Sequence, residues 1–192
     1  MDGRDEMLDT PVKLTYDDFV RFPDDGRRHE LIDGEHVVTP SPNTAHQRAS
    51  RALFRLLDQH ASTHHLGEVF YAPFDVVLSR FDVVEPDLLF IAAGQADILT
   101  PEHVRGAPAL VIEILSPGTR RRDERQKRAL YEREGVQEYW VVDPHRREIV
   151  VHRRDEPGVF TKATLDAAAA LTTSLLPGLV ISLKTIFEQQ QD

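Results

Sequence analysis

The 192-residue sequence predicts an α/β fold in which a central mixed β-sheet is flanked by helices and extended by β-hairpins. Short apolar runs bounded by proline and glycine recur along the chain, as expected for strands. Two longer segments, residues 43–65 and 121–134, instead have the helical period. No repeat and no long linker divides the chain, so we expect one domain over residues 13–192 after a flexible tail at residues 1–12.

The first two elements follow from a helix cap and a turn. Thr15 and Asp18 are spaced as the N-cap and the third helical position, which predicts a short helix over residues 15–19. Residues 29–38 predict a β-hairpin, because the dipeptide at positions 33 and 34, Asp-Gly, is a typical two-residue turn between strands.

Residues 43–65 predict a long helix. Either Asn43 or Thr44 supplies its N-cap, and Gly67 stops it. Its apolar residues follow the helical period, with arginines interleaved: Ala49, Leu53, Leu56 and Leu57.

Strands and loops follow this helix. Residues 68–71 and 74–78 predict two strands broken by Pro73, and residues 83–91 predict a third strand that is interrupted by polar residues. Residues 92–106 predict a loop with one helical turn. The remaining predicted elements are a buried strand at 109–115, a helix at 121–134 stopped by Gly135, a hairpin of 138–143 and 148–152, and short strands and a last helix near Ile186 after residue 160.

Composition limits the possible functions. The chain has no cysteine, which excludes disulfides, thiolate zinc sites and thiol nucleophiles. No apolar run approaches the roughly 18 residues needed to cross a bilayer, and the charged N-terminus lacks the apolar core of a signal peptide. We therefore expect a cytoplasmic protein without a membrane partner. The net charge of -9 argues against a protein that coats nucleic acid, but not against an enzyme whose acids gather in a metal site.

Two acids lie in apolar segments. Glu113 interrupts the buried strand 109–115, where an unpaired carboxylate costs roughly 2–7 kcal/mol or more, so a cation must compensate it. Asp87 begins its own strand within the interrupted segment 83–91, and if this strand pairs with the Glu113 strand, the carboxylates converge. Such a pair raises one pKa unless a divalent ion relieves the repulsion. The oxygen-rich site suits Mg²⁺ or Mn²⁺.

A basic stretch follows, from Arg120 to Arg128. Within it, Asp123, Lys127 and Tyr131 have i, i+4, i+8 spacing, which places them on one helical face. Two acids and a lysine beside a basic helix predict metal-assisted hydrolysis of a phosphodiester, in which a lysine holds the nucleophile or the phosphate.

Five segments together resemble a known family. The chain is similar to the Uma-two (Uma2) family of putative restriction endonucleases, which belongs to the PD-(D/E)XK nuclease superfamily. The resemblance covers nearly the whole chain beyond the N-terminal tail and implies a restriction-endonuclease-like fold. Its segments are HELIDGE at 29–35, TAHQ at 44–47, EPDLLFI at 85–91, the stretch 110–144, and LLPGLVISL at 175–183.

The resemblance also implies roles for single residues. Asp87 and Glu113 would be metal ligands, with the backbone carbonyl of Ile114 as a third, and Glu30 matches an additional acid. The superfamily has a lysine two residues after the second acid, where this chain has Leu115, and the resemblance implies that Lys127 replaces it. The implied activity is a Mg²⁺- or Mn²⁺-dependent endodeoxyribonuclease. Its partner is DNA, and we expect a homodimer, because cutting both strands of a duplex usually needs two sites.

Further contacts to nucleic acid are candidates for which a surface or packing role is the more common explanation. Gln47 lies near a helix start, and the arginines Arg120, Arg121 and Arg122 open a helix, so these residues could meet phosphates or simply be solvated. His60, His64 and His65 include an i, i+4 pair with no third ligand nearby. These histidines are more consistent with an exposed helix C-terminus than with a zinc site.

Structural alternatives remain for the main candidates. Asp87 could cap a turn after a proline, Glu113 could form an ion pair with an arginine, and Lys127 could be a solvated helix lysine. For the whole chain, an inactive nuclease fold that binds nucleic acid or protein is the first alternative, which Leu115 favours. The second is a structural or oligomerisation protein whose acids are only ion-paired.

Overall fold

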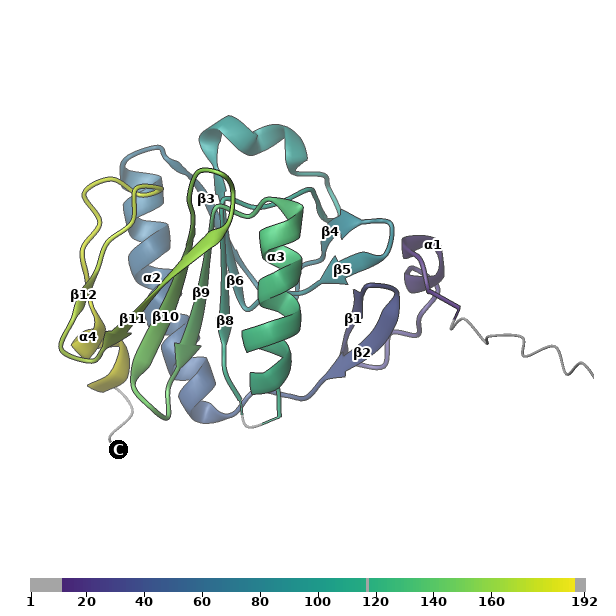
Figure 1. Ribbon diagram of the computed structural model, residues 1–192, viewed down its shortest axis with the longest axis horizontal. Coiled ribbons are helices and arrows are strands. Elements are labelled where there is room, and N and C mark those ends of the chain that lie inside the picture. Colours follow the sequence, from purple (N-terminus) through teal and green to yellow (C-terminus); the bar gives the residue numbers. More distant parts are fainter. Residues whose placement is uncertain (1–11, 117, 189–192) are drawn as a thin grey trace, which may run out of the picture.

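The computed structural model describes residues 12–116 and 118–188, so nearly all of the predicted tail lies outside the described residues. The strands form two larger sheets and a strand pair (Figure 1). The first sheet has six strands in the order β11-β10-β9-β8-β6-β3. Only the pair β8–β9 is parallel in this sheet, which makes it mixed, as predicted. Its strands are β3 (Gly67–Tyr71), β6 (Leu88–Ala92), β8 (Leu110–Ile114), β9 (Glu138–Asp143), β10 (Glu148–Arg154) and β11 (Phe160–Asp166).

The second sheet has five shorter strands in the order β2-β1-β5-β4-β7 and lies on the right in Figure 1. Its strands are β1 (Arg28–Ile32), β2 (Glu35–Thr39), β4 (Val76–Ser79), β5 (Asp82–Val84) and β7 (Val104–Arg105). The strand pair consists of β12 (Ala170–Leu171) and β13 (Ile181–Ser182). Two short helices complete the connections, α1 (Tyr16–Phe19) and the 3₁₀ helix η1 (Ala93–Ile98).

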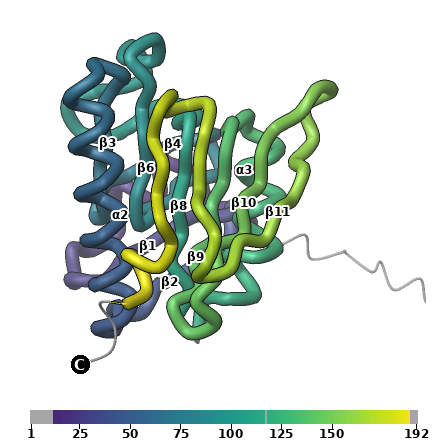
Figure 2. The backbone as a smooth tube through the Cα atoms, turned by 90° about the vertical axis from the view of Figure 1, so that its left-hand side faces the viewer, coloured from purple at the N-terminus to yellow at the C-terminus, as the bar shows by residue number. Residues whose placement is uncertain are grey.

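Helices cover both faces of the six-stranded sheet. The long helix α2 (Thr44–Thr63) and the C-terminal helix α4 (Leu183–Phe187) pack on one face, and Figure 2 shows the C-terminal segment running beside α2. The other face carries the π-helical segment η2 (Arg122–Lys127) and its continuation α3 (Arg128–Glu134) (Figure 1). No described helix combines the length and the apolar character that crossing a bilayer requires.

The alternation predicted for β8 is confirmed. Leu110, Ile112 and Ile114 belong to the core beneath α2, whereas Val111 and Leu115 belong to the core beneath α3. Since side chains alternate along a strand, the side chain of Glu113 lies on the α3 face with Val111 and Leu115.

The predicted caps and turn are also confirmed. Both the backbone N–H and the hydroxyl of Thr15 donate to the carboxylate of Asp18, at 2.9 and 2.7 Å. The Asn43 side chain accepts from the His46 N–H at 2.9 Å, which caps α2. In the β1–β2 hairpin both turn residues have positive φ, 53° at Asp33 and 77° at Gly34, as a type I′ turn requires.

A strand begins one residue after Asp87, close to the predicted start, but the prediction of one interrupted strand over residues 83–91 is wrong. This segment contributes to two sheets, because β5 ends at Val84 and β6 begins at Leu88. Pro86 lies between them and has no N–H to donate to a ladder, so hydrogen bonding of one continuous strand is broken there. The crossing places Glu85 and Asp87 at the junction of the two sheets.

Other boundaries differ in detail. The loop predicted at 92–106 contains η1 and β7, and the strand expected at 74–78 is β4 at Val76–Ser79. Gly67 does not end α2 but opens β3: its φ is +143°, and a Cβ there would come within 2.1 Å of the Ile91 carbonyl oxygen. The helix ended by Gly135, with φ of 95°, is present, although its first half is π-helical. Such π-turns occur frequently at functional sites.

Candidate active site

Two strand ends bring Asp87 and Glu113 together. Strands β6 and β8 are antiparallel with Leu88 opposite Ile112, so the start of β6 lies beside the end of β8. The N–H of Ile114 donates to Oδ2 of Asp87 at 2.8 Å, which fixes the two segments to each other. Asp87 is 5% and Glu113 4% exposed. The pairing therefore has the consequence expected from the sequence: the two buried carboxylates lie at the same end of the paired strands β6 and β8.

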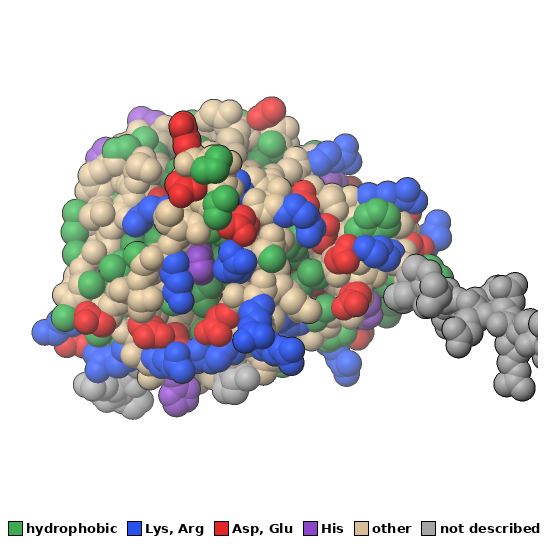
Figure 3. All heavy atoms as spheres, viewed as in Figure 1, with side chains coloured by type: hydrophobic (Ala, Val, Ile, Leu, Met, Phe, Trp, Pro, Cys, Tyr) green, Lys and Arg blue, Asp and Glu red, His purple; other side chains and the backbone are tan. Residues whose placement is uncertain are grey.

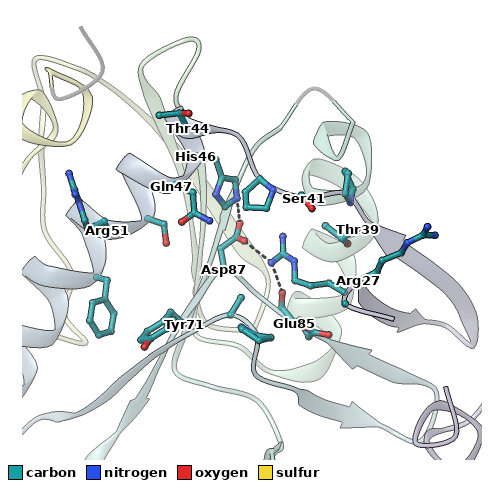
Figure 4. Close-up of a pocket in the computed structure, with 18 of the residues that line it drawn as sticks. Arg27, Thr39, Ser41, Thr44, His46, Gln47, Arg51, Tyr71, Glu85 and Asp87 are labelled. Atoms are coloured by element: carbon teal, nitrogen blue, oxygen red, sulfur yellow. Dashed lines mark hydrogen bonds and ion pairs between the residues drawn. The ribbon is translucent and has the colours of Figure 1, made fainter. Parts of the chain in front are cut away.

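The Asp87 carboxylate is held in its ionised form. Oδ1 accepts from Nη1 of Arg28 at 2.8 Å, and Oδ2 lies 2.9 Å from Nε2 of His46. Figure 4 shows His46 and Asp87 pointing toward each other. Burial favours the protonated form, but the hydrogen bonds and charges of His46 and Arg28, with the Ile114 N–H, lower the pKa of Asp87 to about 2.

The environment of Glu113 instead favours the protonated carboxyl group. Its Oε1 accepts from Nζ of Lys127 at 2.7 Å and from the Tyr131 hydroxyl at 2.8 Å. Burial raises the pKa of Glu113 to about 8; the Lys127 ammonium opposes this rise, whereas Asp123 and Asp87 add to it. The sequence predicted that a cation compensates this buried carboxylate, and the cation is the ammonium group of Lys127.

Lys127 joins the two larger sheets. Its ammonium lies 2.7 Å from Oε1 of Glu113 on β8 and 2.7 Å from Oε1 of Glu30 on β1. Burial disfavours the charged lysine, but Glu113, Glu30 and Asp123 together raise the pKa of Lys127 above its usual value. At 3% and 1% exposure, neither Lys127 nor Glu30 is a solvated surface residue.

Glu30 is fixed by two further hydrogen bonds. It accepts from the Thr39 hydroxyl and from the Glu85 N–H, both at 3.0 Å. Burial alone would raise its pKa, but the charge and hydrogen bond of Lys127 and the Glu85 N–H lower it. Glu30 therefore provides Lys127 with a second anchor that is independent of Glu113.

A small cavity lies beside the two carboxylates and Lys127. Its volume is about 10 Å³, close to the room that one water molecule needs. Asp87, Glu113, Ile114 and Lys127 all line it. No group of three or more histidine and acidic side chains in the described part of the chain is arranged to hold a metal ion. Mg²⁺ in proteins is usually held by one or two carboxylates, so Asp87 and Glu113 on one cavity are a fitting pair of donors.

A wide cleft of about 1480 Å³ opens beside the small cavity. Arg28, His46 and Asp87 line both, so the cleft leads from the surface to the two carboxylates. Its other lining residues come from the β1–β2 hairpin, from α2 and from the end of β3, as Figure 4 shows. The arrangement can therefore admit an extended ligand and present one of its groups to Asp87.

The four residues predicted to contact nucleic acid do not lie together on one surface. Gln47 lines the wide cleft. Arg122 lines the small cavity, and its Nε is buried without a hydrogen-bond partner among the described residues. Arg120 instead pairs with Asp143 at 2.5 Å and with Glu124 at 3.1 Å and lines a different cavity. Arg121 is exposed and lines neither the cleft nor the small cavity.

Basic side chains gather at one end of the molecule. In Figure 3 a row of lysine and arginine side chains follows the lower end of the visible face. In the same view of Figure 1, β8 ends and α2 begins at that end. The overall negative charge is therefore unevenly distributed.

Several residues of the site were not assigned from the sequence. Arg28 precedes Glu30 by two residues and so shares its face of β1, which was a usable signal. Tyr131 was expected to pack, but its hydroxyl also donates to Glu113. Glu85 is 8% exposed, and its Oε2 has no hydrogen-bond partner among the described residues. Burial, with Asp75 and Glu30, raises the pKa of Glu85 to about 7.

Comparisons with known proteins give a family and a related fold. The model of the Uma2 family, described as putative restriction endonuclease, matches residues 16–184. The chain is also similar to the crystal structure of a putative nuclease belonging to DUF820 from Anabaena variabilis ATCC 29413. That match has a TM-score of 0.79 at 20% identity and covers 93% of this chain and 98% of the other, which shows a common fold. A search of curated proteins gave no match.

Proposed function

Because the chain belongs to the Uma2 family of putative restriction endonucleases, we propose that it is a metal-dependent endonuclease that hydrolyses phosphodiester bonds in DNA. Membership confirms the resemblance seen in the sequence and supports a hydrolase that acts on nucleic acid; DNA and a divalent metal are the proposed part. The observation that carries the proposal is the shared cavity of Asp87 and Glu113, with the Lys127 ammonium beside it.

Asp87, Glu113 and the carbonyl of Ile114 would hold Mg²⁺ or Mn²⁺. When bound there, the ion would activate a water molecule and stabilise negative charge on the scissile phosphate. Asp87 is suited to this role because its low pKa keeps the carboxylate ionised at neutral pH. A divalent ion would also favour the ionised form of Glu113, which burial disfavours.

Lys127 would act on the phosphate or on the attacking water. An ammonium group has three donors, and the carboxylates of Glu113 and Glu30 engage two of them, which leaves one for the substrate. Glu30 would hold Lys127 in position when Glu113 turns to a metal ion. Arg122, whose Nε is buried on the same cavity, would bind a phosphate oxygen.

A binding module with a nuclease fold is the second candidate function. Leu115 occupies the position where the superfamily usually has its lysine, and Lys127 is held by two carboxylates. This candidate predicts nucleic-acid binding without cleavage in any divalent metal.

The test of the proposed function is plasmid cleavage. We expect purified protein to nick supercoiled plasmid with Mg²⁺ or Mn²⁺ and not with EDTA. Glu113→Gln should lower the cleavage rate at least ~10²–10³-fold, as loss of one transition-state stabiliser does. Glu68→Gln, at an exposed position of β3, is the matched control and should cut like wild type. Wild-type cleavage by Glu113→Gln would exclude Glu113 from the site, and no cleavage in any metal would favour the binding module.

The remaining expectations from the sequence stay predictions. These are the single domain over residues 13–192, the homodimer, the cytoplasmic location and the phosphate contacts of Gln47, Arg120 and Arg121. The ion pairs of Arg120 make it the least available of these residues for a phosphate.

A further inference from the structure

An exposed aromatic ring lies in the wide cleft. Tyr71 is the last residue of β3 and is 61% exposed, although tyrosine usually buries much of its ring. Phe54 of α2 meets it edge to face, with ring centroids 5.0 Å apart and an angle of 81° between the planes. This contact holds the Tyr71 ring against α2 and leaves most of the side chain open to the cleft.

The backbone fixes Tyr71 close to the candidate active site. Tyr71 is paired with Leu88, the residue that follows Asp87, and neighbouring strands lie about 4.8 Å apart. In addition, the N–H of Ala72 donates to the Asp87 carbonyl at 3.2 Å. A ligand that touches Tyr71 therefore also lies near Asp87.

Cationic side chains lie at both ends of the cleft. In Figure 4, Arg51 and Tyr71 lie on one side of Asp87 and Arg27 lies on the other. Arg51 is exposed and makes no ion pair within the described residues, so it is available to a phosphate group. A cationic groove combined with an aromatic platform is the arrangement by which proteins bind single strands of nucleic acid.

We propose that this cleft binds a single-stranded segment of DNA, with one base stacked on Tyr71 and a neighbouring phosphate on Arg51. A base inside a duplex is already stacked on both faces, so away from the duplex ends only an unpaired base can offer its face to the ring. The inference rests on the proposed nuclease function and narrows its substrate to unpaired DNA. Plasmid cleavage is compatible with it, because negative supercoiling favours local opening of the duplex.

The test measures binding of the full chain to labelled oligonucleotides by fluorescence anisotropy, with EDTA present so that no strand is cut. A single strand should bind more tightly than the blunt duplex of the same sequence. Tyr71→Ala should weaken single-strand binding about 5- to 150-fold, the range found when one base-stacking residue is removed. Tyr71→Phe keeps the ring and should bind like wild type.

Two readouts separate stacking from general loss of binding. A 2-aminopurine base in the strand should lose fluorescence on binding to wild type and to Tyr71→Phe, but not to Tyr71→Ala. Arg51→Ala should reduce the slope of log affinity against log salt by about 0.7, as expected for one phosphate contact to a single strand. Arg55→Ala is the matched control, because Arg55 is exposed one turn further along α2 and does not line the cleft.

The outcomes distinguish this inference from the function on which it rests. Equal or tighter binding to the duplex, or unchanged single-strand binding by Tyr71→Ala, would overturn it, even if Glu113-dependent cleavage stands. If single strands bind in a Tyr71-dependent manner but the plasmid assay shows no cleavage in any divalent metal, the result would support this inference and exclude the nuclease function.

Discussion

The ammonium group of Lys127 contacts two buried carboxyl groups that come from different sheets, those of Glu113 and Glu30. Its neighbour Tyr131, one helical turn further on, donates to the same oxygen of Glu113. Removal of one partner from a buried ion pair leaves an uncompensated charge, which costs more than the pair contributes. The residue proposed for catalysis is therefore also a structural residue.

Lys127→Ala should lower the free energy of unfolding by about 3–5 kcal/mol, because both carboxylates lose their cation. Urea denaturation measures this change. Lys162→Ala, at an exposed position of β11, is the control and should stay within about 0.5 kcal/mol of wild type. A Lys127→Ala protein as stable as wild type would mean that the two acids find other partners or are protonated at no cost.

The sequence predicted that Asp87 and Glu113 lie close together, but it did not predict the side chains that contact Asp87. The strand alternation and the pairing of two apolar runs were sufficient to bring Asp87 and Glu113 together. Arg28 and His46 lie 59 and 41 residues before Asp87, and no local pattern connects residues at such distances. Asp123 was expected on the face of Lys127, and it is buried there at 3% exposure.

Among the elements, β10 contains a histidine that should act on stability. His152 is 6% exposed and lies between the rings of Tyr139 and Phe160, each with its centroid 5.8 Å away. Burial, with the charges of Arg128 and Lys162, lowers the pKa of His152 to about 4. The folded protein thus holds this imidazole neutral in a range where an unfolded chain would protonate it.

The sign of the pH dependence follows. Between about pH 6.5 and 4 the unfolded chain binds a proton at this histidine and the folded chain does not, so the contribution of His152 to stability falls as pH falls. The contribution is about 3 kcal/mol, complete above the unfolded pKa and lost near pH 4. Denaturation at several pH values should show this contribution as a change with pH in the stability difference between wild type and His152→Phe. His64→Phe, at the exposed end of α2, should keep the pH dependence of wild type; the same pH dependence in His152→Phe would contradict the assignment.

Across the whole molecule, the site lies where the two larger sheets meet. Glu85 and Asp87 lie on the segment that crosses between them, and Lys127 contacts an acid from each. A ligand that binds this junction stabilises the folded state of both sheets, since the unfolded chain does not contain the site.

Metal should therefore stabilise the whole fold. At a free Mg²⁺ or Mn²⁺ concentration of 100 times Kd, we expect about 2.7 kcal/mol of added stability, seen as a higher thermal midpoint that EDTA reverses. Asp87→Asn should remove the shift, whereas Asp97→Asn, on the exposed face of η1, should retain it. No shift in wild type would favour the structural alternative, in which the acids serve only as ion-pair partners.

The sequence by itself determined the local elements and the identity of the buried acids. The caps of α1 and α2, the Asp33-Gly34 turn and the alternation along β8 each depend on residues a few positions apart, so their physics can be read along the chain. Tertiary structure alone decided that residues 83–91 divide between two sheets and that Lys127, Arg28 and His46 contact the acids. The reason is that a buried charge is compensated by whichever group the packed strands and helices bring to it, and that packing depends on the burial of entire apolar faces.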